Sequence, residues 1–191
     1  ETGIYALERI ARENQKDHLM VVEILMTFIQ QNASLDVEPE QVLRSANQME
    51  VPSPNANNLL RGSILREDIK ASLKVLGRRT WVQSEGGRLT LYHSNLQGTF
   101  LYKPNMRRAN FTNSVLKDSW FTRGDFESAL FIKADLSILL FDGSSLKMAD
   151  FRNANLNGAD LSNVDLRGAL NLEFDQLVGV KSLFRAKLDD D

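Results

Sequence analysis

A five-residue period runs through the second half of this 191-residue chain and constrains its fold more than any other feature. The period matches neither the roughly 3.6 residues of a helical turn nor the two-residue alternation of a strand. Because 42% of the residues are apolar, chance would give a run of this length with a probability on the order of one in a million. Stepping by five from Leu91, sixteen successive positions are large and apolar: Leu91, Leu96, Leu101, Met106, Phe111, Leu116, Phe121, Phe126, Phe131, Leu136, Phe141, Leu146, Phe151, Leu156, Leu161 and Leu166.

Small residues form a second series, two positions before the large ones. Twelve positions follow it: Ser94, Thr99, Ala109, Ser114, Ser119, Gly124, Ala129, Ala134, Ser144, Ala149, Ala154 and Ala159. Large and small side chains therefore alternate at the inward positions, as a chain that turns every five residues needs in a narrow interior. Leu139 and Pro104 break the series. We expect a bulge or widened corner at Leu139 and a missing amide donor at Pro104.

Several repeats share a short motif that resembles the A(D/N)LXX motif of the pentapeptide-repeat family. It is found in the segments 109–111, 134–136, 149–151, 154–156 and 159–161. The resemblance implies an α+β chain in which residues 89–168 form a right-handed quadrilateral β-helix, with four pentapeptides per coil and about four coils. The preceding residues, which include GIYALERIA and DIKASLKVLGRR, resemble the helical segment found before the repeats in some bacterial members.

Before residue 80 the apolar residues recur at helical spacing, which predicts a small helical domain. The first expected helix runs through Ile4, Leu7, Ile10 and Ala11. The second follows an N-cap at Asp17 and turns these residues inward: Leu19, Val22, Leu25, Met26 and Ile29. A third is expected from Pro39 to Met49, and a fourth from Glu67 to Leu76, capped by Gly77. We therefore predict a helical domain and N-terminal cap at 1–80, the β-helix at 81–168, and a C-terminal cap and tail at 169–191.

A solenoid needs both of its ends covered, because an open coil exposes unpaired backbone and core side chains. Trp81, Val82 and the preceding helix are expected to cover one end. For the other end the sequence offers six apolar residues: Phe174, Leu177, Val178, Leu183, Phe184 and Leu188.

The sequence offers no pattern of residues that would carry chemistry. His18 and His93 are the only histidines, cysteine is absent, and no His, Asp or Glu residues stand at the spacing of metal ligands. The many Ser and Asp residues follow the repeat, so a serine near an aspartate is expected everywhere. We predict no catalytic residue, no cofactor-binding residue and no metal ligand, and hence no enzyme.

One column of outward residues departs from the repeat motif and is the candidate interaction site. The residue just before each large one is Phe100, Trp120 and Leu140 at twenty-residue steps, then Asp160, and Tyr102 extends the column. With coils about 4.8 Å apart, this hydrophobic stripe is roughly 10 Å long. In one interpretation the helical domain folds back over the stripe, and in the other a partner binds it.

These observations favour a non-enzymatic scaffold for protein–protein interaction, without naming the partner. The alternative, implied by the resemblance, is a DNA mimic that regulates a topoisomerase. Such a mimic needs a strongly negative surface, whereas residues 89–168 hold nine basic and eight acidic side chains. No nucleic acid partner is expected.

The lack of cysteine and of a long apolar run favours a location in the cytoplasm. If an anchor precedes Glu1, the chain is expected at the cytoplasmic side of a membrane. The oligomeric state is left open.

Overall fold

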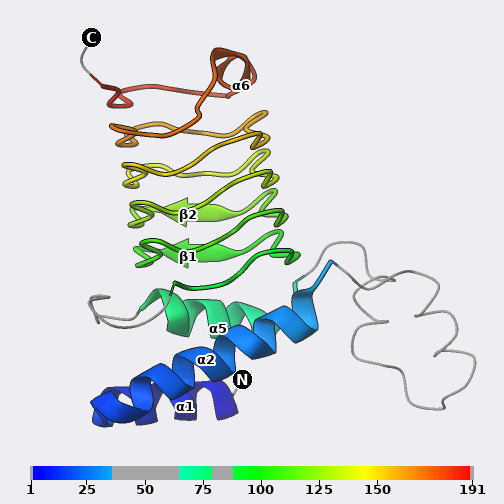
Figure 1. The fold of residues 1–191 in the computed structure, drawn as a ribbon, viewed down its shortest axis with the longest axis vertical. Coiled ribbons are helices and arrows are strands. Elements are labelled where there is room, and N and C mark those ends of the chain that lie inside the picture. Colours follow the sequence, from blue (N-terminus) through cyan, green and yellow to red (C-terminus); the bar gives the residue numbers. More distant parts are fainter. Residues whose placement is uncertain (1, 36–64, 79–87, 190–191) are drawn as a thin grey trace, which may run out of the picture.

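The computed structural model describes residues 2–35, 65–78 and 88–189 of the chain. Its elements are the helices α1 (Thr2–Glu13), α2 (Gln15–Ala33), α5 (Glu67–Gly77) and α6 (Phe174–Val178), and the short strands β1 (Phe100–Tyr102) and β2 (Trp120–Thr122). Figure 1 shows a stack of coils with α1, α2 and α5 at one end and α6 at the other. The predicted helix from Pro39 to Met49 and the predicted covering residues Trp81 and Val82 lie outside the described residues.

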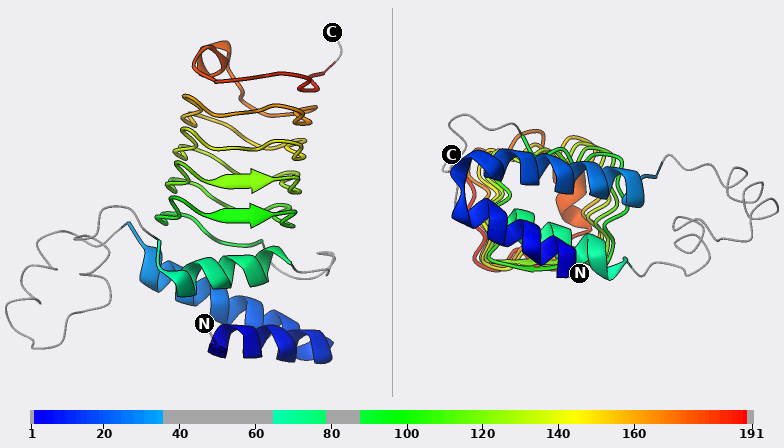
Figure 2. Two further views of the ribbon diagram at one scale, coloured as in Figure 1. Left: turned by 180° about the vertical axis from the view of Figure 1, so that it is seen from behind. Right: turned by 90° about the horizontal axis from the view of Figure 1, so that it is seen from below.

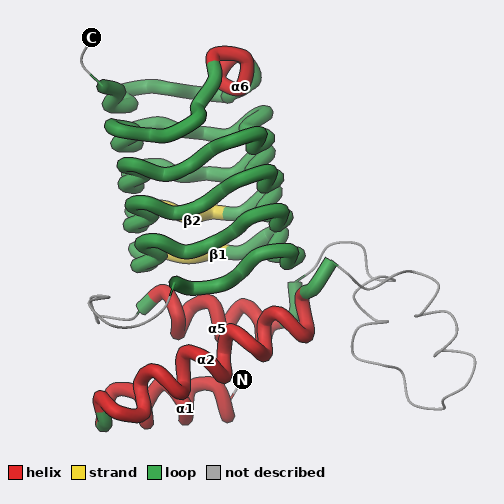
Figure 3. Tube along the Cα trace, viewed as in Figure 1, coloured by secondary structure: helices red, strands yellow, loops and turns green. Residues whose placement is uncertain are grey.

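The repeats form a solenoid in which each residue lies above the one twenty positions earlier. Two hydrogen bonds recur from coil to coil: Asn110 N donates to Leu89 O at 2.7 Å, and Leu91 N donates to Asn110 O at 2.8 Å. Parallel bridges twenty residues apart run from Thr90–Asn110 to Asp150–Leu170. Most of each coil consists of turns, so Figure 3 draws it as loop apart from β1 and β2. Backbone pairing therefore holds the stack together with few regular strands.

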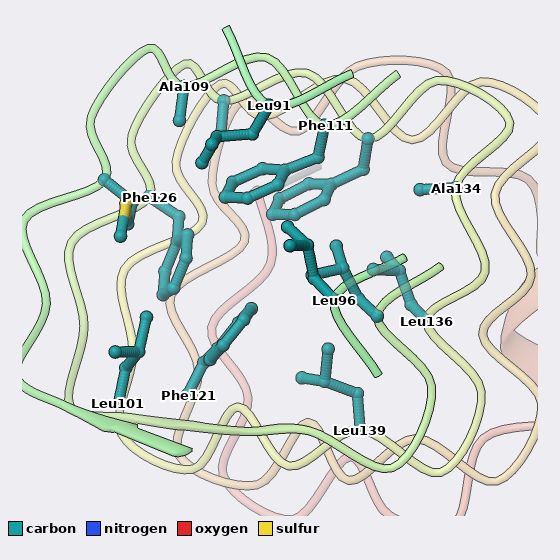
Figure 4. Packing of buried hydrophobic residues seen from close by; sticks show 14 of the residues in the cluster. Leu91, Leu96, Leu101, Ala109, Phe111, Phe121, Phe126, Ala134, Leu136 and Leu139 are labelled. Carbon is teal, nitrogen blue, oxygen red and sulfur yellow. The ribbon is translucent and has the colours of Figure 1, made fainter. Parts of the chain in front are cut away.

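The predicted inward ladder is confirmed, because all sixteen large residues from Leu91 to Leu166 are at most 4% exposed. Figure 4 shows such side chains pointing into the interior from the surrounding coils. Phe111, Phe131 and Phe151 stack along one side, with ring centroids 5.4 and 5.5 Å apart. Each buried aromatic or aliphatic side chain stabilises the fold by roughly 1.5–3 kcal/mol relative to its exposed state.

The bulge predicted at Leu139 is wrong, because the ladder continues through this residue without a change of register. Leu140 N donates to Ser119 O and Asp160 N to Leu139 O, both at 2.9 Å, as in the other coils. The Leu139 side chain is fully buried. Figure 4 shows it inside the coil between Leu136 and Phe121. The interior accommodates a larger side chain here because the neighbouring positions in this column, Ser119 and Ala159, are small.

Pro104 fits into the coil because its neighbours in space, Gly77 of α5 and Gly124 of the next coil, have no side chains. Its carbonyl accepts a hydrogen bond from Asp125 N at 2.8 Å, so the coil is not interrupted there. A Cβ atom on Gly124 would lie 2.9 Å from Pro104 Cγ, and one on Gly77 would lie 3.1 Å from Pro104 Cβ. In other columns the amide at this position can donate to a serine of the next coil, as Ser94 N does to Ser114 Oγ at 3.1 Å. A proline has no such amide, and Gly124 has no such acceptor.

The N-terminal helices differ from the prediction in their starts and faces. α2 begins at Gln15 and only Asn14 separates it from α1, so the predicted N-cap at Asp17 is wrong. Asn14 Nδ2 donates to Asp17 Oδ2 at 2.8 Å, which ties the turn between the two helices to the first turn of α2. Leu25 and Ile29 are buried as expected, and Ile4, Leu7, Ala11, Val22 and Met26 pack partly against the core. Ile10 and Leu19 are exposed instead.

α2 and α5 close the N-terminal end of the solenoid with their last carbonyl groups. Asn95 N donates to Ala33 O at 2.6 Å and Asn105 N donates to Gly77 O at 2.7 Å. In later coils the equivalent amides donate to the preceding coil, so the carbonyl groups at the two helix ends replace a missing coil. Gly77 lies inside α5 and has no left-handed backbone, so its predicted role as a cap residue is wrong. Its lack of a side chain lets α5 approach Pro104.

α5 buries the predicted face, and one core joins the helices to the solenoid. Ile69, Leu73 and Leu76 are at most 1% exposed and belong to the same hydrophobic cluster as the inward ladder. α2 touches the first coil as well, where Gln30 Nε2 donates to Thr90 O at 3.1 Å. The right-hand view of Figure 2 shows these helices lying across the end of the coils.

The C-terminal end is less covered than the sequence suggested. Of the six expected covering residues, Leu177 and Leu183 pack against the core. The other four are exposed: Phe174, Val178, Phe184 and Leu188. The ladder also extends beyond residue 168, because Ser182 pairs with Asp160 and Lys187 pairs with Asp165. These partners are twenty-two residues apart instead of twenty, so the segment that contains α6 holds two residues more than a regular coil. This segment therefore adds two further sides to the solenoid, offset by two residues from the repeat.

Candidate interaction surface

The solenoid aligns the predicted hydrophobic stripe on one side. β1 and β2 pair in parallel with Phe100 opposite Trp120, and bridges continue the column from Trp120 to Leu140 and from Leu140 to Asp160. The Phe100 and Trp120 ring centroids are 6.1 Å apart with a 55° angle between the rings. β1 and β2 are the only regular strands among the described residues, so the stripe begins on the most regular part of the solenoid.

Most of the stripe is open to solvent. Phe100 is 52% exposed, Tyr102 55% and Trp120 49%, whereas Leu140 is partly buried. α1, α2 and α5 lie across the end of the coils and not along this side (Figures 1 and 2). These three helices therefore do not cover the stripe, contrary to the first interpretation of the sequence.

Basic side chains flank the aromatic part of the stripe. Lys103 Nζ lies 5.3 Å from the centre of the Tyr102 ring, a cation–π distance. Arg123 Nη1 donates to Tyr102 Oη at 3.4 Å. Neither cation is paired with a carboxylate within the described part of the chain. This flank thus combines exposed rings with positive charge that no described acidic group neutralises.

At the other end of the stripe, the residue that follows Leu140 in the column is the carboxylate Asp160. Ser162 N donates to Asp160 Oδ1 at 3.1 Å, and Lys181 Nζ lies 3.4 Å from Oδ2. Hydrogen bonding to Ser162, followed by the nearby Lys181, holds the pKa of Asp160 below its usual value despite partial burial. The stripe therefore changes from aromatic to acidic along the solenoid axis.

Ile138 is a neighbour of the stripe that the sequence reasoning missed. It is 53% exposed and lies at the corner two residues before Leu140. Its φ of 58° is left-handed, a conformation that strains a β-branched residue, and no other left-handed corner among the described residues holds a β-branched side chain. An isoleucine at a corner position was the available signal.

The adjacent side of the solenoid pairs its charges, in contrast to the stripe. Arg107 forms two hydrogen bonds with Glu127, at 2.6 and 2.7 Å, and these bonds raise the pKa of the guanidinium. Lys147 and Arg167 both contact Asp165, whose pKa is held well below its usual range mainly by the Arg167 hydrogen bond. This side is a mixed, paired surface.

The described residues include no group of three His, Cys, Asp or Glu side chains arranged to hold a metal ion. None of the described helices is long and apolar enough to cross a membrane. His93 and Asn113 lie 3.0 Å apart through a ring nitrogen and a side-chain amide, which joins two coils.

The family of pentapeptide repeats matches this chain in eight copies, over residues 90–127, 109–137 and 140–170. These are the residues that step by five and whose large side chains line the interior. No curated protein matches the chain.

One solved structure that is similar to this chain is a pentapeptide repeat protein from the thylakoid lumen of Arabidopsis thaliana. It has 24% identity and a TM-score of 0.32, and the match covers 48% of this chain and 56% of that one. Another is Rfr23 from the cyanobacterium Cyanothece 51142, at 25% identity and a TM-score of 0.28 over 56% and 65% of the two chains. A third is full-length QnrB1, a plasmid-mediated fluoroquinolone resistance protein, at 20% identity and a TM-score of 0.32 over 53% and 58%. The chain thus spans less than two thirds of each of these proteins.

Proposed function

We propose that this chain, whose residues 90–137 and 140–170 match the family of pentapeptide repeats, is a non-enzymatic scaffold that binds a partner protein through the stripe of Phe100, Tyr102, Trp120 and Leu140. The observation that carries the proposal is the exposed aromatic column on β1 and β2. Monomeric proteins rarely leave such a patch open, and interface centres are enriched in Trp, Tyr and Phe.

A scaffold role fits the remaining physical features of the repeats. The interior is filled by side chains, so it offers no space for a substrate among the described coils. The stacked ladder fixes the backbone positions of Phe100 and Trp120, which lowers the entropy cost of ordering this surface on binding. A rigid surface with a central aromatic group is what a protein partner can recognise.

The arrangement of the chain forms part of the same proposal. We take residues 1–80 as helical domain and N-terminal cap, 81–168 as a quadrilateral solenoid of about four coils, and 169–191 as C-terminal cap and tail. We infer a cytoplasmic location, which cell fractionation with an antibody to this chain would test. A DNA mimic is disfavoured because the charges of residues 89–168 nearly balance, nine basic against eight acidic.

The test is affinity capture with this chain as bait, beside a Phe100→Asp, Trp120→Asp double variant. A matched control is Tyr92→Asp, which places the same charge on another exposed aromatic residue (44% exposed) on a different side of the first coil. Thermal unfolding must show that both variants keep the fold. We expect a partner that the wild type and the control retain and that the double variant loses. Equal capture by all three baits would refute the stripe as the binding site.

A further inference from the structure

The stripe lies between a basic corner and an acidic corner of the solenoid. Lys103 and Arg123 are exposed residues at one corner, twenty positions apart, with left-handed φ values of 51° and 54°. Asp118 is exposed at the corner on the other flank, two residues before Trp120. The exposed rings are therefore bordered by positive charge on one flank and by negative charge on the other.

The coils hold both cations in place beside the stripe. Lys103 N donates to Thr122 O at 2.9 Å. Arg123 N donates to Asp142 O, also at 2.9 Å, so the backbone of each cation is fixed by the next coil. Both side chains contact Tyr102, whose ring lies near Lys103 Nζ and whose hydroxyl accepts a hydrogen bond from Arg123 Nη1. The positive flank is therefore formed before a partner binds, which lowers the entropy cost of using it.

The basic corner keeps donors that a carboxylate can use. Arg123 donates through Nη1 to Tyr102, and its other N–H groups donate to no described residue. Asp142, twenty residues after Thr122, binds the following coil instead, where Asn163 Nδ2 donates to its Oδ1 at 2.7 Å. A guanidinium with free N–H groups can bind a carboxylate through two parallel hydrogen bonds. A carboxylate is therefore the partner group that suits this flank.

The spacing of the stripe fits a helix better than an extended strand. Figure 1 shows β1 and β2 one above the other on this side. Neighbouring coils are about 4.8 Å apart, so Trp120 and Leu140 lie about 5 Å and about 10 Å beyond Phe100 along the axis. Helix positions i+3 or i+4 and i+7 rise by about 5 Å and about 10 Å from position i. Alternate residues of a strand rise by about 7 Å each and lose this match at the third residue.

We propose that the partner segment is an acidic amphipathic helix that lies along the stripe, parallel to the solenoid axis. This inference rests on the proposed scaffold function and specifies the chemistry of the partner. The apolar face of the helix packs on Phe100, Trp120 and Leu140. Glutamate or aspartate side chains on one flank of the helix bind Lys103 and Arg123.

Exposed rings beside cations also suit the headgroup region of an anionic membrane, but the acidic residues of this side oppose that occupant. Asp118 borders Trp120, and Asp160 continues the column beyond Leu140. An anionic surface broad enough to contact the whole stripe would bring lipid phosphates close to both carboxylates. A helix avoids this repulsion because its acidic residues can lie on one flank alone. The charges around the stripe therefore favour a protein segment.

The test uses two synthetic peptides of about three heptads, each with leucine at every a and d position and with helicity confirmed by circular dichroism. One carries glutamate on one flank of the leucine face, and the other carries lysine at the same positions. Fluorescence anisotropy measures the Kd of each peptide for the whole chain. We expect the acidic peptide to bind at least about tenfold more tightly, and its affinity to fall steeply as salt is added.

Charge reversal at the basic corner should invert this preference. For the variant Lys103→Glu, Arg123→Glu, we expect the lysine peptide to bind more tightly than the acidic one. The matched control is Arg108→Glu, Lys133→Glu, which reverses one arginine and one lysine at other exposed, left-handed corners and should keep the wild-type preference. The same loss of preference in both variants would show a long-range charge effect and overturn the assigned flank.

Three outcomes separate this inference from the proposed function. Equal Kd values for the two peptides, with both lost in Phe100→Asp, Trp120→Asp, overturn the acidic partner and leave the scaffold function standing. Binding of the acidic peptide that this double variant retains counts against the stripe itself. No measurable binding of the acidic peptide to the wild type overturns the inference, whereas the scaffold function is judged by affinity capture.

Two further probes test the helix and the membrane. Replacing the central leucine of the acidic peptide with proline should weaken binding at least about tenfold, because proline breaks the helix. An unchanged Kd contradicts a helical partner. Vesicles of phosphatidylcholine with phosphatidylserine should not sediment with the chain. Sedimentation that Trp120→Asp abolishes would assign the stripe to a membrane surface and overturn the inference.

Discussion

The two ends of the solenoid meet the same physical requirement in different ways. At the N-terminal end of the solenoid, the last carbonyls of α2 and α5 accept hydrogen bonds from the amides of Asn95 and Asn105. The hydrophobic core continues there into the helices, through Leu73 and Ile29. At the C-terminal end α6 lies over one half, where Gln176 Nε2 donates to Phe151 O and Ala154 O, and the amides of Leu183, Arg185 and Leu188 donate to no described residue. An open coil edge is thus closed when helix ends supply backbone acceptors, and apolar residues alone do not close it.

Matched truncations of one leucine at each end should give the largest contrast. Leu73→Ala removes a side chain that is 1% exposed and should lower the free energy of unfolding by about 2–5 kcal/mol, because a cavity remains. Leu188→Ala removes one that is 52% exposed and should cost less than about 1 kcal/mol. Urea unfolding measures both. Similar losses for the two variants would contradict the difference between the ends.

A change near the closed N-terminal end should have an intermediate effect on stability. Gly124→Ala places a Cβ atom 2.9 Å from Pro104 Cγ and 2.5 Å from a Phe126 ring carbon, and overpacking should cost about 1–3 kcal/mol in thermal unfolding. Adding Pro104→Ala should recover part of the loss, since it removes one of the two contacts. Gly3→Ala is the control, because Gly3 like Gly124 lacks a left-handed backbone but meets nothing within 4 Å, and this change should not lower the melting temperature. Additive effects of Gly124→Ala and Pro104→Ala would show that the column is not tightly packed.

The smallest effect is expected for the partly exposed ion pairs of Asp165, towards the C-terminal end. Arg167 and Lys147 lower the pKa of Asp165 from its ordinary 3.8, so its charged form stabilises the fold above that pH. This contribution is lost as the pH falls below about 4 towards the lowered value. Asp165→Asn should therefore cost less than about 1 kcal/mol at neutral pH, because the pair is solvent-screened, and clearly less than that near about pH 2. A variant less stable than the wild type by the same amount at both pH values would exclude this origin.

Much of the solenoid was predictable because its contacts are set by a fixed step. Once residues twenty apart pair in parallel, the inward ladder and the alignment of Phe100, Trp120 and Leu140 follow by counting. The prediction failed at Leu139, where a large side chain at a small position did not force a bulge. The fit depends on the volumes of the residues above and below, which a single repeat does not reveal.

The helical end was less predictable because its contacts join distant segments. Gln30 meets Thr90 and Gly77 meets Pro104, and no local pattern indicates these pairs. The exposure of the stripe also depended on where the helices lie. The register of the last segment depended on the two residues that are inserted at α6, so that Ser182 and Lys187 pair with residues twenty-two positions earlier.

The sequence by itself determined the solenoid, its filled interior and the stripe on one side, because a five-residue period with parallel stacking repeats the same local geometry at every step. Only the tertiary structure decided which helix faces are buried, that Gly77 permits close packing with Pro104, and that the carbonyls at the ends of α2 and α5 close the N-terminal end. The physical reason is that hydrogen-bond partners and close packing at the ends come from segments far apart in the chain, whose relative positions no local period specifies.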